Sequence, residues 1–171
     1  MPYQFACRAA LATLFAAGFS TAQPVRVGTY DSRAIAVAYA HSDFMREDHQ
    51  ALVAERDKAK KDGDEKGVRE IEARGGAVQQ RLHLQGFSTG SVIDLIRKID
   101  AEIPGVAKAA GVLLIVSKWE VMYRAPAVEY VDVTIPLVKK FGADAQVLKT
   151  VEELMKHDPI PADKLPMEME H

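Results

Sequence analysis

Cysteine is nearly absent from this chain of 171 residues, which contains only Cys7. A single thiol cannot form a disulfide within the chain, so no disulfide framework stabilises the fold. The sequence therefore predicts a domain that depends on its hydrophobic core or on oligomerisation. With 48% hydrophobic and 27% charged residues, the composition fits one soluble globular domain.

The chain also lacks an excess of either charge sign. It has 22 lysine and arginine residues against 24 aspartate and glutamate residues. A protein that binds nucleic acid or an anionic membrane surface usually carries a basic excess. We therefore expect no nucleic-acid partner.

The sequence also lacks two motifs for phosphate and metal binding. It contains no glycine-rich phosphate loop and no H-E-x-x-H motif. His41 and His49 are eight residues apart and would share a face of one helix, but a metal site needs three or four converging ligands. Two solvated histidines are the better interpretation. We expect a protein that is not an enzyme and that binds no cofactor or metal.

The apolar segment near the N-terminus, residues 9–19, is shorter than the roughly 20 residues that span a bilayer. Arg8 precedes it and small residues occupy positions 20–22, which is the layout of a secretory signal peptide. A buried N-terminal helix is the alternative. A signal peptide over residues 1–22 predicts a periplasmic protein without stable membrane insertion. The remaining chain has 149 residues, with 21 basic and 24 acidic side chains.

Residues 25–30 are rich in β-forming side chains and predict a strand. Asp31 or Ser32 then provides a helix cap. Alanines in residues 33–40 favour a helix that packs closely against a neighbour. Ile35 would also fit a strand that continues, so both interpretations of this segment stay open.

Residues 43–74 mix ten acidic with eight basic side chains, which favours an exposed helical hairpin over disorder. Gly63 predicts the tip of this hairpin. Apolar or small residues recur on both sides of the tip at coiled-coil spacings. These two seams are Met45, Leu52 and Ala59 before the tip, and Val68, Ile71, Gly75, Val78 and Leu82 after it. We expect an arm over about residues 40–90, with a first helix of about 29 residues and about 40 Å.

The segment GFSTGS, residues 86–91, interrupts the second helix of the hairpin. It is a linker or, alternatively, a glycine-lined cradle for an anion. Ser91 and Asp94 resemble a capping box, and a broad apolar stripe follows. Pro104 is expected to kink or restart that helix, and Gly111 to end it.

The stretch LLIVSKWEVMY, residues 113–123, predicts a β-hairpin. Its strands would cover residues 113–116 and 121–123, with Trp119 at or near the turn. Trp119 is either an anchor for a partner or a cover for the sheet or for the apolar stripe. Residues 124–131, which contain Pro126, are expected to form a loop. A helix ending at Phe141 and a second short helix are expected to follow.

The order of these elements resembles the Skp/OmpH-like family of periplasmic chaperones. The likeness is carried by VGTYDSRAI and by VAKAAGVLLIVSKWEVMYRAP with the later VDVT, and it covers residues 25–141. The resemblance implies a trimer in which strands of all subunits build one β body and helical arms enclose unfolded outer-membrane proteins. The chain departs from the family in its shorter arms, its interrupted second helix, its mildly acidic charge and its C-terminal extension. The positions that match the family pattern are Asp31, Gly111, Tyr123, Asp132 and Thr134.

We therefore predict an α+β fold with a small antiparallel β body, shared between subunits, and a long projecting α-helical hairpin arm. Residues 23–142 would form the Skp/OmpH-like domain, and residues 143–171 a short helix and a proline-bearing tail. A lone sheet of two or three strands is marginal, which favours a homo-oligomer, and the resemblance implies a trimer. Candidate residues of the body are Val25, Val27, Leu113, Ile115, Val121 and Tyr123.

The predicted function is that of a holdase, a chaperone that binds unfolded outer-membrane or envelope proteins without ATP. Such a surface binds many chains weakly through mixed charges and scattered apolar groups. One alternative is a non-enzymatic envelope adaptor or scaffold that binds one folded partner. Another is a ligand-binding protein or enzyme with its site at residues 86–91. Candidate client contacts are Phe44, Met45, Val53, Leu84, Phe87 and Trp119, of which the first five also fit the seam between the arm helices.

Overall fold

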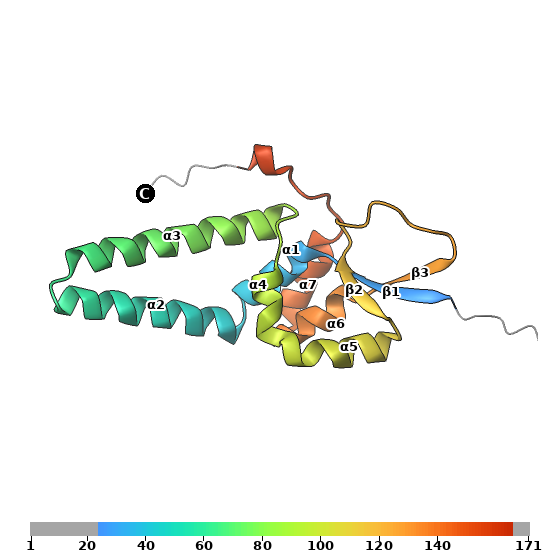
Figure 1. Cartoon of the computed structure of the whole chain (residues 1–171), viewed down its shortest axis with the longest axis horizontal. Coiled ribbons are helices and arrows are strands. Elements are labelled where there is room, and N and C mark those ends of the chain that lie inside the picture. The colour runs from blue at the N-terminus through green and yellow to red at the C-terminus, as the bar shows by residue number, and fades with distance from the viewer. Residues whose placement is uncertain (1–23, 166–171) are drawn as a thin grey trace, which may run out of the picture.

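The computed structural model describes residues 24–165. In that part of the chain, helices pack against a small sheet, and two helices extend together away from it (Figure 1). The predicted signal peptide, residues 1–22, lies outside the described residues. No helix within residues 24–165 is both long enough and apolar enough to cross a bilayer.

Three parallel strands form the sheet in the order β2-β1-β3. The strands are β1 (Val25–Tyr30), β2 (Leu114–Ser117) and β3 (Val128–Asp132). The helices are α1 (Ser32–Ala40), α2 (Asp43–Lys61), α3 (Glu65–Phe87), α4 (Ile93–Ile96), α5 (Ile103–Ala110), α6 (Thr134–Val138) and α7 (Ala145–Leu154), with 3₁₀ turns η1 (Arg97–Glu102), η2 (Lys139–Phe141) and η3 (Ala162–Lys164).

The prediction of an antiparallel β body is wrong. Residues 121–123 form no strand, so the expected β-hairpin does not exist, and β2 pairs with β1 in parallel instead. The long helical connection from β1 to β2 permits this arrangement, since parallel strands need a crossover of a dozen or more residues. The third strand is β3, a segment that we expected to be a loop. All three strands of this sheet come from one chain.

The two faces of the sheet differ in their cover. Ile115 and Val131, which flank Gly28, pack against the helical core on one face. The opposite face carries Val25 and Leu114, which are 50% and 48% exposed. Parallel sheets are usually covered on both faces, whereas this outer face is open at the amino ends of β1 and β2. Val27 and Thr29, farther along β1 on the same face, are buried.

Helix α1 lies at the centre of the core. The side chain of Asp31 accepts a hydrogen bond from Arg33 N at 3.0 Å and caps the helix, as predicted. Almost every residue of α1 is buried, and the helix contacts α2, α3, α4, α6 and α7. Its small side chains allow these close contacts: a Cβ atom on Gly86 of α3 would lie 4.0 Å from Ala36 Cβ.

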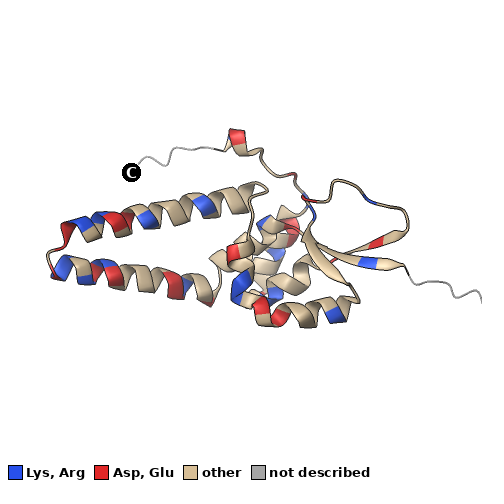
Figure 2. Ribbon diagram, viewed as in Figure 1, with Lys and Arg blue, Asp and Glu red and all other residues tan. Residues whose placement is uncertain are grey.

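The prediction of a long arm is also wrong. Ser42 caps a new helix, so α2 has 19 residues rather than about 29 and spans about 28 Å. The inner end of α3 packs against α1 instead of standing free in solvent. Gly63 lies at the tip with a positive φ of 71°, as its predicted role requires. Figure 2 shows both charge signs along α2 and the outer half of α3.

The apolar stripe after α3 is buried, but its local structure differs from the prediction. Ser91 and Asp94 form no capping box, because α4 begins at Ile93 and has no side-chain cap. Pro104 lies in the first turn of α5, where a missing backbone donor is tolerated. Gly111 ends α5 with a left-handed φ of 64°, as predicted.

Candidate functional site

The six residues predicted to form the β body do not share one environment. Val27 and Ile115 lie in paired strands, and Ile115 packs against the core. Val121 and Tyr123 lie in the loop between β2 and β3, where Tyr123 is 76% exposed. The remaining two, Val25 and Leu113, are exposed at the start of β1 and just before β2.

The predicted client contacts on α2 are half-buried. Phe44 and Met45 pack against the hydrophobic core. The ring of Phe44 meets Phe141 edge to face, with 6.1 Å between the ring centroids. Val53, farther along α2, is also half-buried. Neither Phe44 nor Met45 is therefore a freely exposed contact.

The candidates on α3 are the exposed members of the set. Leu84 is 39% exposed and Phe87 is 51% exposed, and the ring of Phe87 packs edge to face against His83. Trp119 lies in a different place, beside the end of the sheet. The structure thus does not gather the six predicted contacts on one surface.

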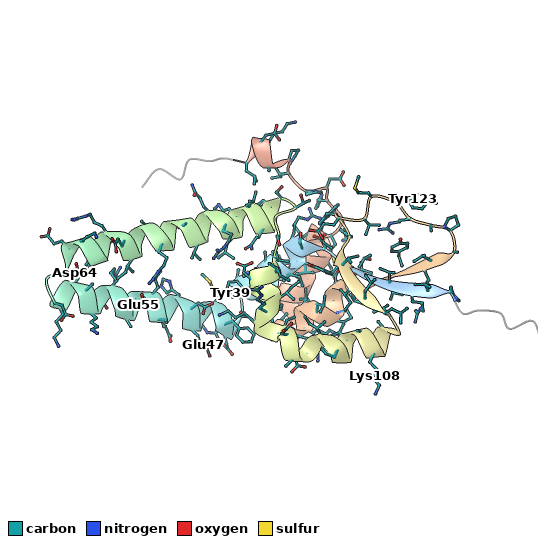
Figure 3. The ribbon with its side chains drawn as sticks, viewed as in Figure 1. Tyr39, Glu47, Glu55, Asp64, Lys108 and Tyr123 are labelled. Atoms are coloured by element: carbon teal, nitrogen blue, oxygen red, sulfur yellow. The ribbon has the colours of Figure 1, made fainter. Side chains whose placement is uncertain are left out.

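Helices α2 and α3 project together from the rest of the fold, and we call them the helical pair. A cavity of about 160 Å³ lies at their inner end. We call it the root cleft. Figure 3 shows Tyr39 beside this inner end, with Asp64 at the tip of the pair and Tyr123 at the far end of the molecule. The root cleft is lined by Tyr39, Asp48, Val78, Arg81, Leu82, Asp94, Leu95 and Lys98.

One wall of the root cleft is a hydrogen-bonded triad from three elements. Tyr39 of α1 donates its hydroxyl to Asp48 of α2 at 2.7 Å, and Lys98 of η1 binds the same carboxylate at 2.7 Å. Burial favours the neutral form of Asp48, but the hydrogen bonds from Lys98 and Tyr39 outweigh it and lower the pKa of the carboxyl group. Burial and the Asp48 charge raise the pKa of Tyr39. Tyr39 therefore stays a neutral donor.

The opposite wall is built around Asp94. Its Oδ1 accepts a hydrogen bond from Gln85 Nε2 at 2.8 Å, and its Oδ2 lies 3.3 Å from Arg81 Nε. Gln85 is buried and also donates to the Ser91 carbonyl at 2.7 Å. This side chain ties the segment after α3 back onto the helix and fixes the position of Asp94.

Sequence patterns indicate only part of this site. Val78 and Leu82 were recognised as seam residues, but we expected the seam to be closed by the facing helix. Tyr39, Arg81 and Lys98 were not singled out, because they belong to three elements that only the tertiary fold brings together. The one signal in the sequence for an open site is Asp48. It is a charged residue at a seam position of the first helix, where an apolar side chain would be needed to close the contact between the two helices.

A second charged cluster lies at the carboxyl ends of β1 and β2. Asp31 is fully buried and binds Arg33 Nη2 and Lys118 Nζ, each at 2.8 Å. Burial alone would raise the pKa of Asp31, but the hydrogen bonds and charges of Arg33 and Lys118 outweigh it and lower the pKa. Two cations therefore share one carboxylate here. One of them, Arg33, is also almost completely buried.

Trp119 closes this charged cluster. Its indole Nε1 donates to Asp31 Oδ1 at 3.3 Å. Its ring lies 4.4 Å from Lys118 Nζ and 5.1 Å from Arg33 Cζ, which are cation–π distances. Ligands of open parallel sheets bind at such carboxyl ends, but here the place is occupied by the protein's own ion cluster. Trp119 has its polar partner within the chain.

The segment 86–91 shows no sign of an anion cradle. A Cβ atom on Gly90 would lie 3.2 Å from the Leu84 carbonyl oxygen and 3.3 Å from Gln85 N, so the segment is packed tightly onto the end of α3. The following helix, α4, has only four residues. A folded-back linker accounts for these contacts.

The fold defines a mixed helix and strand protein in which a three-stranded parallel sheet supports a projecting pair of helices. Comparison of the chain with protein-family models, with curated protein sequences and with solved structures finds no match. The resemblance to the Skp/OmpH-like family therefore stays a prediction.

Proposed function

We propose that this protein is an ATP-independent holdase that binds unfolded outer-membrane or other envelope proteins through its helical pair. The observation that supports the proposal is the exposure of the pair. Helix α2 buries none of its 19 residues, and Gln85 is the only buried residue of α3. Among the large apolar side chains of the pair, Leu84 and Phe87 of α3 are exposed and therefore available to a bound chain.

The charges of the pair fit the same role. Arg74 of α3 pairs with Glu55 of α2, and Lys66 and Glu70 pair along α3. These ion pairs are exposed, so each contributes little to stability. They keep the surface soluble while it carries scattered apolar groups, and such a surface can bind many different chains weakly.

The test is the aggregation of an unfolded outer-membrane β-barrel protein diluted from urea, followed by light scattering. Residues 23–171 are expected to suppress scattering at stoichiometric ratios. Leu84→Ser with Phe87→Ser is expected to weaken the suppression, because both side chains are exposed on α3. Ile93→Ser is the control, since Ile93 is similarly exposed, at 56%, but lies outside the pair. A folded wild-type protein that leaves scattering unchanged would exclude the holdase function.

We also propose that copies of the chain associate through the open face of the sheet. Val25 and Leu114 are exposed on that face, and Figure 3 shows Tyr123, in the loop between β2 and β3, at the same end of the molecule as the sheet. Met122, next to Tyr123 in this loop, is fully exposed. An apolar surface of this kind marks a protein–protein interface in a soluble chain. A second copy would cover the face that helices leave open.

The mass of residues 23–171 in solution tests this association. We expect an oligomer, and we expect Met122→Asp to shift the mass toward the monomer, because a charge at a buried interface is costly. Leu84→Asp on α3 is the control and should leave the mass unchanged. A monomeric wild-type protein would contradict self-association. The open face would then favour the adaptor alternative, in which one folded partner covers it.

A further inference from the structure

We propose that the root cleft binds one aromatic side chain of an extended segment in a bound protein. This inference rests on the proposed function and specifies which feature of a client the helical pair selects. It is carried by the size of the cleft, by its apolar floor and by the charges around it.

The size of the root cleft matches one ring. Its volume is about 160 Å³, and an apolar protein cavity of about 150 Å³ is known to bind benzene. A phenyl or phenol group therefore fits. An alanine or serine side chain would leave most of the cleft to water.

The floor of the root cleft is apolar because the seam of the helical pair opens there. Toward the tip the seam is closed: a Cβ atom on Gly75 would lie only 3.2 Å from Leu52 Cδ2. At the inner end, Val78 and Leu82 line the cleft together with Asp48 of α2, and both side chains are only half-buried, although Leu82 also packs against the core. An inserted ring would contact both side chains and would remove more of their apolar surface from water.

The charges around the root cleft favour a neutral ring over a charged side chain. Asp48 is paired with Lys98, and Asp94 is paired with Arg81, so both acids are already neutralised. Arg81 is more than half exposed, so the face of its guanidinium can lie over a bound ring while its Nε stays paired with Asp94. A lysine or glutamate in the cleft would need to displace one of these pairs.

The probe for this inference is N-acetyl-phenylalaninamide, compared with N-acetyl-lysinamide and N-acetyl-alaninamide. We expect the phenylalanine probe to shift the backbone amide NMR signals of Val78, Arg81 and Leu82 in a saturable way. The lysine and alanine probes should bind at least about tenfold more weakly, because they bury no ring. Equal shifts with all three probes, or none with the phenylalanine probe, would overturn the proposal.

Two matched variants place the binding in the cleft. Val78→Phe puts a ring of the protein's own into the cleft, and we expect it to weaken binding of the phenylalanine probe by about tenfold or more. Ala77→Phe adds the same ring at the neighbouring, exposed position and should leave binding unchanged. Should Val78→Phe fail to fold, Arg81→Ala on the exposed rim is expected to reduce the preference for phenylalanine over alanine. Full binding by folded Val78→Phe would place the ring elsewhere.

The two proposals fail in distinguishable ways. A protein that binds the phenylalanine probe in the cleft but does not suppress aggregation would retain the cleft and lose the holdase function. The opposite result is that the Val78→Phe and Ala77→Phe variants suppress aggregation equally well and that the phenylalanine probe shifts no signals. This result would retain the holdase function and exclude the aromatic site.

Discussion

Replacing Asp31 by alanine is expected to destabilise the protein by about 3–5 kcal/mol, because it leaves a buried charge without its partner. The Arg33 side chain is only 2% exposed and donates two hydrogen bonds to Asp31 from its guanidinium group, and the Arg33 backbone N–H donates a third. Lys118 and Trp119 would lose the same acceptor. The substitution also removes the cap of α1.

Urea unfolding of residues 23–171, followed by circular dichroism, measures this change. Glu153→Ala is the control, since Glu153 forms ion pairs only with exposed neighbours and should give no measurable change. The double variant Asp31→Ala, Arg33→Met should recover part of the loss, because it removes the unpaired charge along with its partner. A loss below about 1 kcal/mol in Asp31→Ala would show that Arg33 reaches water in the folded state.

The same cluster predicts how stability depends on pH. The folded state holds the pKa of Asp31 below its ordinary value of about 3.9. The carboxylate therefore contributes stability above about pH 4, and this contribution is lost as the pH falls through the lower, folded-state pKa. Asp31→Ala should lack this part of the acid-induced loss, so the free energies of unfolding of the two proteins should converge in acid.

Local signals in the sequence were sufficient for several elements. The cap at Asp31, the tip at Gly63 and the helix end at Gly111 each depend on neighbours within a few residues, and each is confirmed. Such features follow from backbone geometry and short-range hydrogen bonds. These local features do not depend on how distant parts of the chain pack.

Strand pairing could not be predicted from such local signals. Residues 113–117 are apolar enough for a strand, but their composition does not say whether the neighbouring strand is parallel or antiparallel. We assigned the partner to the nearby residues 121–123, and the structure pairs the strand with β1, more than eighty positions earlier. The segment that became β3 follows Pro126, and that proline favoured a loop.

The root cleft could not be predicted from local sequence patterns either. The spacing of Val78 and Leu82 indicates that they are seam residues, but their exposure depends on how far apart α2 and α3 lie at their inner ends. That separation follows from the packing of α3 on α1 and from the triad of Tyr39, Asp48 and Lys98. No periodicity in the sequence encodes contacts among four separate elements.

Replacing Ile35 by alanine is expected to cost about 2–5 kcal/mol. Ile35 is fully buried in α1, and α1 contacts helices on several sides. A cavity here cannot collapse easily, because the surrounding helices are held by their own contacts and by the sheet. Thermal or urea unfolding of residues 23–171 measures the loss.

Ile93→Ala is the matched control, since the same side chain at position 93 is 56% exposed and its removal should change stability by less than about 0.5 kcal/mol. Equal losses in the two variants would show that α1 is not the centre of the core. The position of Ile35 also couples the two charged sites, because α1 carries Asp31 and Arg33 at one end and Tyr39 at the other. A displaced α1 would loosen the root cleft, so Ile35→Ala should also weaken binding of the phenylalanine probe, whereas Ile93→Ala should not.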